Sequence, residues 1–377
     1  MFKFGLSTVG FLQIRLLMVS LLLNFAIEAS TVFLPLYARD IGASSLSIGL
    51  IAASYGLAFF LSSLIFGSQS DKNGRVVYIR WGLGLSTVAY LAQIFTSTAL
   101  GLLLVRGLVG FSLGVTSAAI MAYTYENQKK VGGFASYGSL GLLLGAITAA
   151  MVSNYEVLFL ISGIASAVAF LISLTFKEAR SLYSYSRIGS LPVMKENRKI
   201  LLSFFIRQLA ANAIWVILPL YLASLGANKS WIAILDGINM GMQFIIMQFV
   251  ERFNPIKMFR IGLLLSVVVF LAYGITDNFM QLIPVQVLLA LAWSCMFVGA
   301  LTYLLKNSRE KGTVSGLMYS TMYLSAGIGP FLGGVVAQIW GYVTLMYIGA
   351  GLSACSLLNT IDISREKNKP TQTSSSL

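Results

Sequence analysis

Long apolar runs, separated by short charged segments, dominate this sequence and limit what it can fold into. A helix that crosses about 30 Å of hydrocarbon needs about 20 apolar residues, and the sequence contains twelve such runs. Only 10% of the residues are charged, against about 25% in a typical soluble domain. One soluble core cannot hide so much apolar surface, so lipid must solvate the outside. The sequence therefore predicts an all-α membrane protein with twelve spans.

The predicted spans fall into two halves on either side of a charged segment. They cover residues 14–38, 45–67, 76–96, 98–123, 131–153, 155–176, 199–224, 230–250, 257–276, 278–304, 312–338 and 342–362. We expect an N-terminal half at 1–176, a cytoplasmic linker at 177–198, a C-terminal half at 199–364 and a disordered tail at 365–377.

The two halves repeat each other. Residues 32–43 read VFLPLYARDIGA and residues 216–227 read VILPLYLASLGA, a shift of 184 residues. Small residues also match at this shift, GAITAA at 145–150 against GPFLGG at 329–334. Two similar halves in a membrane protein, with a charge buried in the first helix of one, indicate a transporter.

The basic residues predict the orientation. Twelve spans with both termini in the cytoplasm place 22 Lys and Arg residues inside, and leave only Arg39 and Lys229 outside. Positive charge collects on the cytoplasmic side of membrane proteins. We therefore expect a multi-pass protein of the plasma membrane, surrounded by the lipid bilayer, with cytoplasmic N- and C-termini.

Composition excludes several other functions. The net charge of +13 is spread in short clusters between apolar runs, which is not the pattern of a nucleic-acid surface. The sequence has no His, the commonest catalytic base and metal ligand. Cys295 and Cys355 lie inside apolar runs and are interpreted as packing residues. We expect no enzyme activity, no metal, no cofactor and no nucleic-acid partner, and a monomer.

The first cytoplasmic loop resembles a family motif. Gly67, Asp71, Gly74 and Arg75 follow the spacing of the loop between spans two and three in the major facilitator superfamily. The resemblance implies a major facilitator fold: twelve transmembrane helices in two pseudo-symmetric six-helix bundles, which alternately open a central site to each side. It also implies that spans one, four, seven and ten line the cavity.

Two further motifs resemble the proton-driven drug efflux members. Span four carries Arg106 followed by Gly110 and Gly114, similar to their span-four motif. Residues 327–334, GIGPFLGG, are similar to the glycine-proline motif of the antiporters, which in that group lies in span five. Here it lies in span eleven, so the resemblance is firmer for the superfamily than for the antiporters.

The loop motif predicts a conformational latch made by Gly67, Asp71, Gly74 and Arg75. The Asp71 carboxylate is expected to accept hydrogen bonds from a helix N-terminus in the other half, where the helix dipole favours an anion. This contact would hold the cytoplasmic side closed. The alternative is a solvated turn held by Gly74.

Polar faces on spans one and seven predict a central aqueous cavity, because lipid-facing polar groups would stay unsatisfied. Helical spacing aligns Asn24, Glu28 and Thr31, and the repeat aligns Gln208, Asn212 and Trp215 with them. The alternative is polar contact between packed helices. The predicted substrate-binding residues are Asn24, Glu28, Thr31, Arg207, Gln208, Asn212, Trp215, Asp236, Gln243 and Trp293.

Four charged side chains, Glu28, Arg106, Arg207 and Asp236, lie well inside the spans rather than near their ends, and three of them are predicted to couple protons. Removal from water favours the neutral form of a carboxyl group, so Glu28 is the candidate proton carrier, with Arg106 and Asp236 as partners. The alternative for Glu28 is a permanent salt bridge with Arg106 or Arg207. Arg207 could instead extend toward the cytoplasmic surface, and Asp236 could be wetted from outside.

These features predict a secondary active transporter that works by alternating access, with proton-coupled efflux of a small amphipathic organic molecule. A transporter or facilitator of a sugar, metabolite, peptide or lipid is the alternative of the same fold. A membrane receptor or scaffold that has lost transport is the third hypothesis.

Overall fold

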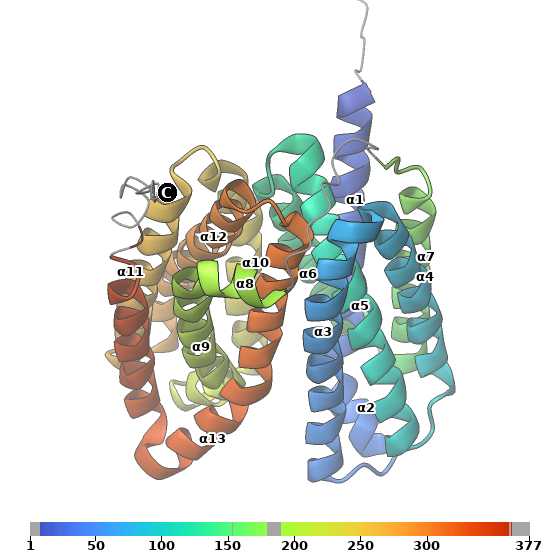
Figure 1. The fold of residues 1–377 in the computed structure, drawn as a ribbon. Helices are drawn as coiled ribbons and strands as arrows, with labels where there is room; N and C mark the ends of the chain where they lie inside the picture. Colours follow the sequence, from blue (N-terminus) through green and yellow to red (C-terminus); the bar gives the residue numbers. More distant parts are fainter. Residues whose placement is uncertain (1–7, 153, 179–189, 362, 364–377) are drawn as a thin grey trace, which may run out of the picture.

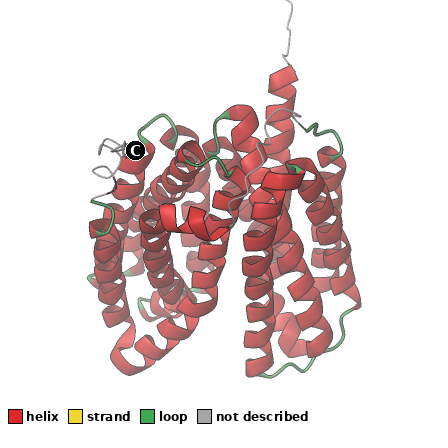
Figure 2. Ribbon diagram, in the orientation of Figure 1, coloured by secondary structure: helices red, strands yellow, loops and turns green. Residues whose placement is uncertain are grey.

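The computed structural model describes residues 8–152, 154–178, 190–361 and 363, and every regular element within them is helical (Figure 2). The N-terminal half contains α1 (Thr8–Thr31), α2 (Leu34–Asp40), α3 (Ser45–Asn73), α4 (Arg75–Ala92), the 3-10 helix η1 (Gln93–Phe95), α5 (Ala99–Gln128), α6 (Gly132–Met151) and α7 (Tyr155–Ser173). The C-terminal half contains α8 (Ser190–Glu196), α9 (Arg198–Ser224), α10 (Lys229–Val250), α11 (Pro255–Gly274), the 3-10 helix η2 (Phe279–Gln281), α12 (Leu282–Asn307) and α13 (Lys311–Leu358).

The helices agree with twelve membrane crossings. Ten helical segments of the described chain are long and apolar enough to span a bilayer. The helix α4, which carries Arg75 and Arg80, adds one more. The element α13 adds another, because non-helical backbone at Gly341 (φ 82°, ψ 170°) divides it between the predicted eleventh and twelfth spans. The predicted fold class is confirmed.

The first predicted span, 14–38, is not one helix. Turns at Val32 and Phe33 separate α1 from α2. Pro35 lies in the first turn of α2, where its missing N–H leaves no hydrogen bond unmade. The repeated proline, Pro219, lies inside α9 instead. The same sequence pattern therefore breaks one helix and is accommodated within the other.

The helices form two bundles side by side, with α8 and the beginning of α1 toward the same face (Figure 1). In one bundle, α1 packs on α6 and α7, and α5 packs on α3 and α4. In the other, α9 packs on α13, and α12 packs on α10 and α11. Between the bundles, α3 and α5 contact α13, and α6 contacts α10. We call the face that carries α8 the α8 face.

The exact domain limits stay a prediction. Most of the predicted linker, residues 179–189, lies outside the described residues. The predicted tail at 365–377 also lies outside them.

Glycines set the closest helix contacts. A β-carbon on Gly110 of α5 would lie 2.1 Å from the carbonyl oxygen of Tyr55 in α3. Between the bundles, a β-carbon on Gly316 of α13 would lie 2.3 Å from the carbonyl oxygen of Ser63. A backbone oxygen cannot rotate away from an added β-carbon as a flexible side chain can, so these two positions require glycine.

We predict that Gly110→Ala destabilises the N-terminal bundle by about 1–3 kcal/mol, because the added methyl group forces α3 and α5 apart. The matched control is Gly334→Ala, at a helical glycine with no atom within 4 Å of its β-carbon position. The melting temperature of the purified protein, followed by tryptophan fluorescence, should fall for Gly110→Ala alone. Equal melting temperatures for the two variants would contradict the packing described here.

Candidate functional site

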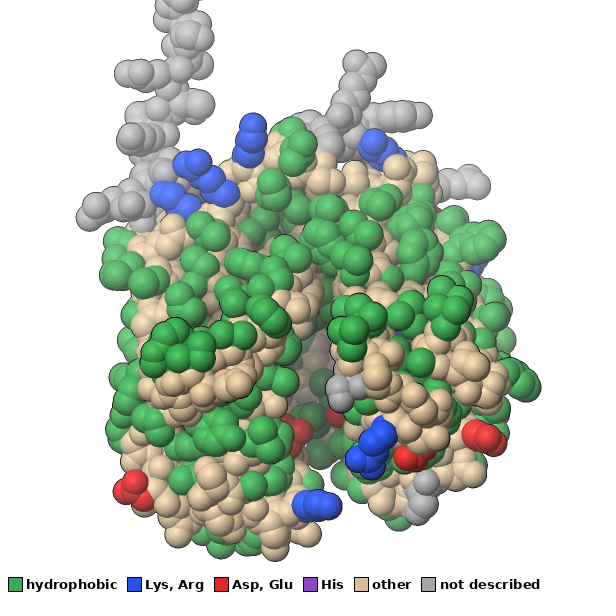
Figure 3. Space-filling model, turned by 90° about the horizontal axis from the view of Figure 1, so that it is seen from below, with side chains coloured by type: hydrophobic (Ala, Val, Ile, Leu, Met, Phe, Trp, Pro, Cys, Tyr) green, Lys and Arg blue, Asp and Glu red, His purple; other side chains and the backbone are tan. Residues whose placement is uncertain are grey.

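A hollow between the bundles opens on the face opposite α8, and acidic side chains lie near its centre (Figure 3). It contains two adjoining cavities. The outer cavity has a volume of about 510 Å³ and the inner cavity about 330 Å³. They share Leu142, Trp215, Gln243 and Trp293 in their walls. The larger part of each wall is apolar and aromatic.

Seven of the ten side chains predicted to bind substrate line one or both cavities. These seven are Asn24, Gln208, Asn212, Trp215, Asp236, Gln243 and Trp293. The remaining three, Glu28, Thr31 and Arg207, form no part of either wall. The structure therefore brings together residues from α1, α9, α10 and α12, as expected for a site between two bundles.

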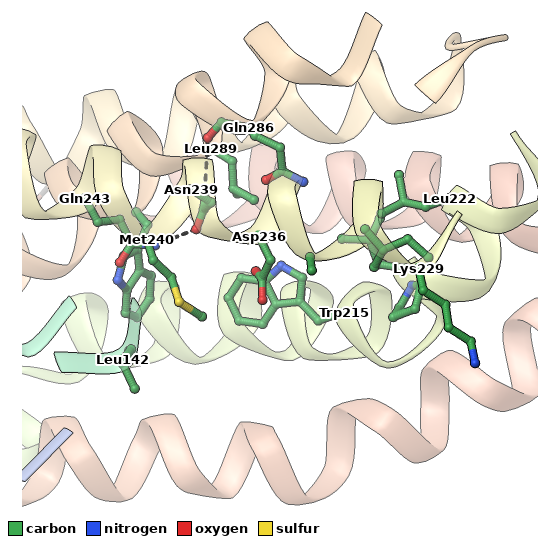
Figure 4. Close-up of a pocket in the computed structure, with 15 residues that line it drawn as sticks. Leu142, Trp215, Leu222, Lys229, Asp236, Asn239, Met240, Gln243, Gln286 and Leu289 are labelled. Atoms are coloured by element: carbon green, nitrogen blue, oxygen red, sulfur yellow. Dashed lines mark hydrogen bonds between the residues drawn. The ribbon is translucent and has the colours of Figure 1, made fainter. Parts of the chain in front are cut away.

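One face of α10 carries a polar stripe into the outer cavity (Figure 4). Asn239 donates a hydrogen bond to the backbone oxygen of Gln286, 3.1 Å away. Gln243 donates to the Asn239 side chain (2.6 Å) and accepts from Ser139 of α6 (3.1 Å). This chain of hydrogen bonds connects the two bundles beside Asp236.

The carboxylates of Asp236 and Glu28 have neither a hydrogen bond nor an ion pair with any described residue. The Glu28 side chain packs where a β-carbon on Gly145 of α6 would stand, 2.8 Å from its own β-carbon. The Asp236 side chain points into the outer cavity from α10. The two carboxylates interact electrostatically across the bundle boundary. A proton or a cation can relieve that repulsion.

Arg106 is buried in the N-terminal bundle without a carboxylate partner. Its Nη2 donates to the hydroxyl of Thr31 at 3.2 Å, and its guanidinium lies 4.6 Å from the ring centre of Tyr55. Its Nε and Nη1 have no hydrogen-bond partner among the described residues. The alternative of a salt bridge between Glu28 and Arg106 is not formed in this conformation.

Arg207 is fully buried in the C-terminal bundle and does not extend to the surface. Its Nε donates to Ser266 (2.9 Å) and its Nη1 donates to Gln208 (2.6 Å). The rings of Trp215 and Trp293 lie 5.9 Å and 5.8 Å from the guanidinium. Arg207 therefore supports two aromatic walls of the cavity from behind, by cation–π contact.

Asp71 lies at the N-terminus of α13, a helix of the other bundle. Its carboxylate accepts hydrogen bonds from the N–H groups of Gly312 (2.9 Å) and Thr313 (2.7 Å) and from the Thr313 hydroxyl (2.6 Å). The positive end of the helix dipole favours an anion there. A β-carbon on Gly67 would lie 2.6 Å from the backbone oxygen of Gly312. The contact thus closes this side of the α8 face.

Arg75 supports this contact from within its own bundle. Its guanidinium pairs with Asp71 at 2.6 Å and with Glu126 of α5 at 2.8 Å. Glu178 accepts from the backbone N–H groups of Arg75 and Val76, both at 2.8 Å. Gly74 has φ 98°, a backbone conformation that strongly favours glycine and allows α4 to start at once.

Sequence reasoning did not find Glu126 and Glu178. Both stand at the ends of apolar runs in charged segments, where an acid ordinarily faces water. Nothing in their local sequence indicates that they surround Arg75. Only the packing of α5 and the chain after α7 against α4 brings them together.

The sequence matches a known protein family over most of its length. The family model of the Major Facilitator Superfamily matches residues 16–189 and 200–376 of this chain. The chain belongs to the major facilitator superfamily. It is therefore a multi-pass membrane transporter and not an enzyme, as predicted.

Curated relatives in this superfamily cover most of the chain. Multidrug resistance protein MdtG of Citrobacter koseri is 25% identical over 356 residues, covering 85% of this chain and 86% of the relative. The protein of the same name from Salmonella choleraesuis is 24% identical over 358 residues, covering 85% and 87%.

Solved structures share the fold at lower sequence identity. The human organic anion transporter MFSD10 superposes with a TM-score of 0.81 at 16% identity, covering 94% of this chain and 100% of that one. The fucose:proton symporter FucP of E. coli gives 0.78 at 16% identity, covering 97% and 100%. These superfamily structures show the same fold and carry different substrates.

We predict that Asp71→Asn opens the α8 face, because hydrogen bonds to a charged acceptor stabilise by about 1.5–3 kcal/mol. The probe is Ser315→Cys on α13, a fully buried position near this contact, with Cys295 and Cys355 replaced by serine. Its alkylation by N-ethylmaleimide should become at least about tenfold faster with Asp71→Asn.

The matched control is Lys72→Gln, which removes an exposed charge from α3, the helix that carries Asp71. It should leave the alkylation rate as it is. An unchanged rate with Asp71→Asn would show that Asp71 does not hold this face closed.

Proposed function

We propose that this transporter exports small amphipathic organic cations in exchange for protons, by alternating access in the plasma membrane. In this proposal the α8 face is cytoplasmic, both termini are on that side, and the protein works as a monomer. The present conformation is then the one open to the outside. The relatives named for multidrug resistance support efflux of organic molecules.

The unpaired carboxylates of Glu28 and Asp236 beside an aromatic cavity carry this proposal. A charge away from water without a partner is destabilising, and intramembrane charges are retained at functional sites. Either a proton or an organic cation can neutralise the carboxylates. A carboxylate that has bound a proton no longer attracts the cation, so the two ligands compete. Competition of this kind couples the two movements, because each ligand shifts the conformational equilibrium by its difference in affinity.

Each side chain has a distinct role in this mechanism. Asp236 is the first acid met by a cation in the outer cavity. Trp215 and Trp293 offer ring faces to its apolar part. Glu28, deeper at the boundary of α1 and α6, carries the proton. Arg106 stays charged throughout and positions Thr31 and Tyr55 around that carboxyl group.

An organic anion is the second candidate substrate. The Nη2 atom of Arg207 and the Nε and Nη1 atoms of Arg106 have no hydrogen-bond partner among the described residues. Neither guanidinium group lines a cavity in this conformation: Arg207 lies behind Trp215 and Trp293, and Arg106 lies over the Tyr55 ring. An anion would have to reach them after a rearrangement of Trp215, Trp293 or Tyr55. We therefore favour the cation, and the transport assay below includes both charges.

We predict that Glu28→Gln abolishes uphill transport driven by a pH gradient and leaves downhill exchange of substrate intact, because glutamine cannot carry a proton. The assay uses purified protein in liposomes, with tetraphenylphosphonium as the cationic probe and a fluorescent organic sulfonate as the anionic one. Glu156→Gln, which neutralises an exposed acid at the start of α7, is the control and should behave as wild type.

A Glu28→Gln protein that still builds the cation gradient at the wild-type rate would overturn the proton role. Transport of the sulfonate and not of the cation would favour the second candidate. Flux of either probe that is indifferent to the pH gradient in wild type would indicate a facilitator.

We predict that Asp236→Asn weakens binding of tetraphenylphosphonium by about tenfold or more, the effect of losing about 1.4 kcal/mol. The substitution removes the electrostatic attraction between the cation and a carboxylate in a site poor in water. Asp277→Asn, at an exposed acid after α11, is the control. Isothermal titration calorimetry should show a weaker dissociation constant for Asp236→Asn alone. Equal constants would remove Asp236 from the binding site.

A further inference from the structure

The inner cavity, of about 330 Å³, contains polar groups that the proposed function does not use. Among the described residues, no side chain in its wall is charged. Its carboxamides include Asn24 from α1 in one bundle, and Gln208 and Asn212 from α9 in the other. The acids of the proposed mechanism lie elsewhere: Asp236 lines the outer cavity alone, and Glu28 lines neither. The two cavities therefore offer different chemistry to a ligand.

The orientation of the Gln208 amide is fixed by Arg207. Nη1 of Arg207 donates to Oε1 of Gln208 at 2.6 Å. A guanidinium group can only donate, so the amide oxygen must face it. The Nε2 group of Gln208 has no hydrogen bond with any described residue, although the side chain is only 2% exposed. The wall of the inner cavity therefore contains an N–H donor that needs an acceptor from a ligand or water.

The amides of Asn24 and Asn212 are oriented the other way. Nδ2 of Asn24 donates to the backbone oxygen of Ser20 at 2.9 Å. Nδ2 of Asn212 donates to the Ser325 hydroxyl at 3.2 Å, and this hydroxyl donates in turn to the backbone oxygen of Met322. The N–H ends of both amides are therefore bound by protein acceptors. The two Oδ1 atoms accept no hydrogen bond from any described residue.

Glycines on neighbouring helices hold the two asparagines in place. A β-carbon on Gly138 of α6 would lie 2.9 Å from Nδ2 of Asn24. A β-carbon on Gly329 of α13 would lie 2.7 Å from Cβ of Asn212. None of the three free amide atoms, Oδ1 of Asn24, Oδ1 of Asn212 and Nε2 of Gln208, is enclosed by protein. They are therefore held in position and open to the cavity.

The boundary between the two cavities contains Gln243, Trp215 and Trp293. The Gln243 amide is already bonded at both ends, to Asn239 at 2.6 Å and to Ser139 at 3.1 Å. The two indole rings lie 6.5 Å apart between centres, at 79° to each other. This boundary therefore separates a carboxylate on one side from free amide groups on the other.

The rest of the inner wall is aromatic and thioether in character. Trp293 stacks on Phe297 with ring centres 5.1 Å apart. Met121, Met247 and Met322 also line the cavity. Aromatic rings pack well on aryl groups, and methionine side chains adapt to ligands of different shape. The apolar part of a ligand in this cavity is therefore expected to be an aryl group.

The free amide atoms select against a charged group in the inner cavity. They require one acceptor for Gln208, and N–H donors for Asn24 and Asn212. A cationic group would leave the Gln208 donor without an acceptor, and no carboxylate in the wall would balance its charge. An anionic group would face the two amide oxygens. A carboxamide carries a C=O acceptor and an N–H donor on adjacent atoms and is neutral, so it matches both kinds of free atom.

We propose that the inner cavity is a binding subsite for a neutral aromatic carboxamide, separate from the cation site at Asp236. The C=O group of the ligand accepts from Gln208, and its N–H group donates to Asn24 or Asn212. One amphipathic substrate then extends across the boundary, with its cationic end in the outer cavity. This inference rests on the proposed function and deepens it, because it names a second chemical group of the substrate.

The test compares two neutral probes of similar size, N-phenylbenzamide and phenyl benzoate, in which an ester oxygen replaces the N–H group. A scintillation proximity assay measures binding of tritiated N-phenylbenzamide to the purified protein, and the unlabelled amide or ester displaces it. No cation and no pH gradient is present. We expect the ester to bind wild type about tenfold more weakly, because it cannot donate to Asn24 or Asn212.

The variants separate the donor from the acceptors. Gln208→Glu keeps an oxygen for Arg207 and removes the N–H donor, so it should weaken binding of both probes by about tenfold. Asn24→Ala combined with Asn212→Ala should weaken binding of the amide and leave that of the ester, so that the two affinities become similar. The matched control is Gln248→Glu, the same change at an exposed residue of α10. It should bind both probes as wild type does.

Equal affinities of wild type for the amide and the ester would overturn the proposal without any variant, as would the absence of displaceable amide binding. A Gln208→Glu protein that binds the amide as wild type does would also overturn it. Loss of amide binding in Asp236→Asn would place the amide in the outer cavity and contradict a separate subsite.

Tetraphenylphosphonium tests the cation site independently in the same preparation. A protein that binds the amide as described, but not the phosphonium, retains this subsite and contradicts the proposed function. A protein that binds the phosphonium, but not the amide, contradicts only this inference. Failure of the proposed function and failure of this inference are therefore distinguishable.

Discussion

A carboxylate held by the first N–H groups of a helix from the other bundle is the contact on which this structure depends. Asp71 accepts three hydrogen bonds from Gly312 and Thr313, and its carboxylate also pairs with Arg75. Glycines at the same crossing let the two backbones approach. With the α8 face drawn together there, the bundles diverge toward the opposite face, and the hollow that contains Asp236 opens on that side.

The charges inside the membrane follow a common pattern. Arg106 and Arg207 are enclosed by aromatic rings and neutral hydrogen-bond acceptors, so their charge is stabilised without a carboxylate. Glu28 and Asp236 have no such partners among the described residues. Their carboxylates interact electrostatically with each other across the bundle boundary. The arginines are therefore held within their own bundles, outside the cavity walls, whereas the two acids keep no partner of their own. This division is what the proposed exchange of a proton for a cation requires.

Much of the fold could be predicted from the sequence because lipid imposes a simple rule on helix length and polarity. The twelve runs and the loop around Asp71 follow from local composition and spacing, but the break between α1 and α2 does not, because the run at 14–38 has the composition of one span. The partners of Arg75 could not be predicted. Glu126 and Glu178 are distant in sequence and lie in charged segments like any surface acid. Their roles arise from packing.

The candidate site could also be predicted only in part from the sequence. Helical spacing aligned residues on spans one and seven, and of these Asn24, Gln208, Asn212 and Trp215 line the cavities, whereas Glu28 and Thr31 do not. It could not show that Arg207 turns behind Trp215 and Trp293, because position along a helix does not fix which neighbour a long side chain meets. Glu251 lies in the short segment ERFNP at 251–255, which does not reproduce the Gly67, Asp71, Gly74 and Arg75 motif of the first loop. Its carboxylate accepts hydrogen bonds from the Val131 and Gly132 N–H groups at the start of α6, in the other half of the chain.

The central claim is that a carboxyl group in the hollow exchanges a proton for a cation. The most direct measurement adds tetraphenylphosphonium to the purified, weakly buffered protein and follows proton release with a pH indicator. The account predicts release that saturates with cation binding and disappears in the Glu28→Gln, Asp236→Asn double variant. Stoichiometric cation binding with no release of protons at any pH between about 5 and 8 would contradict it.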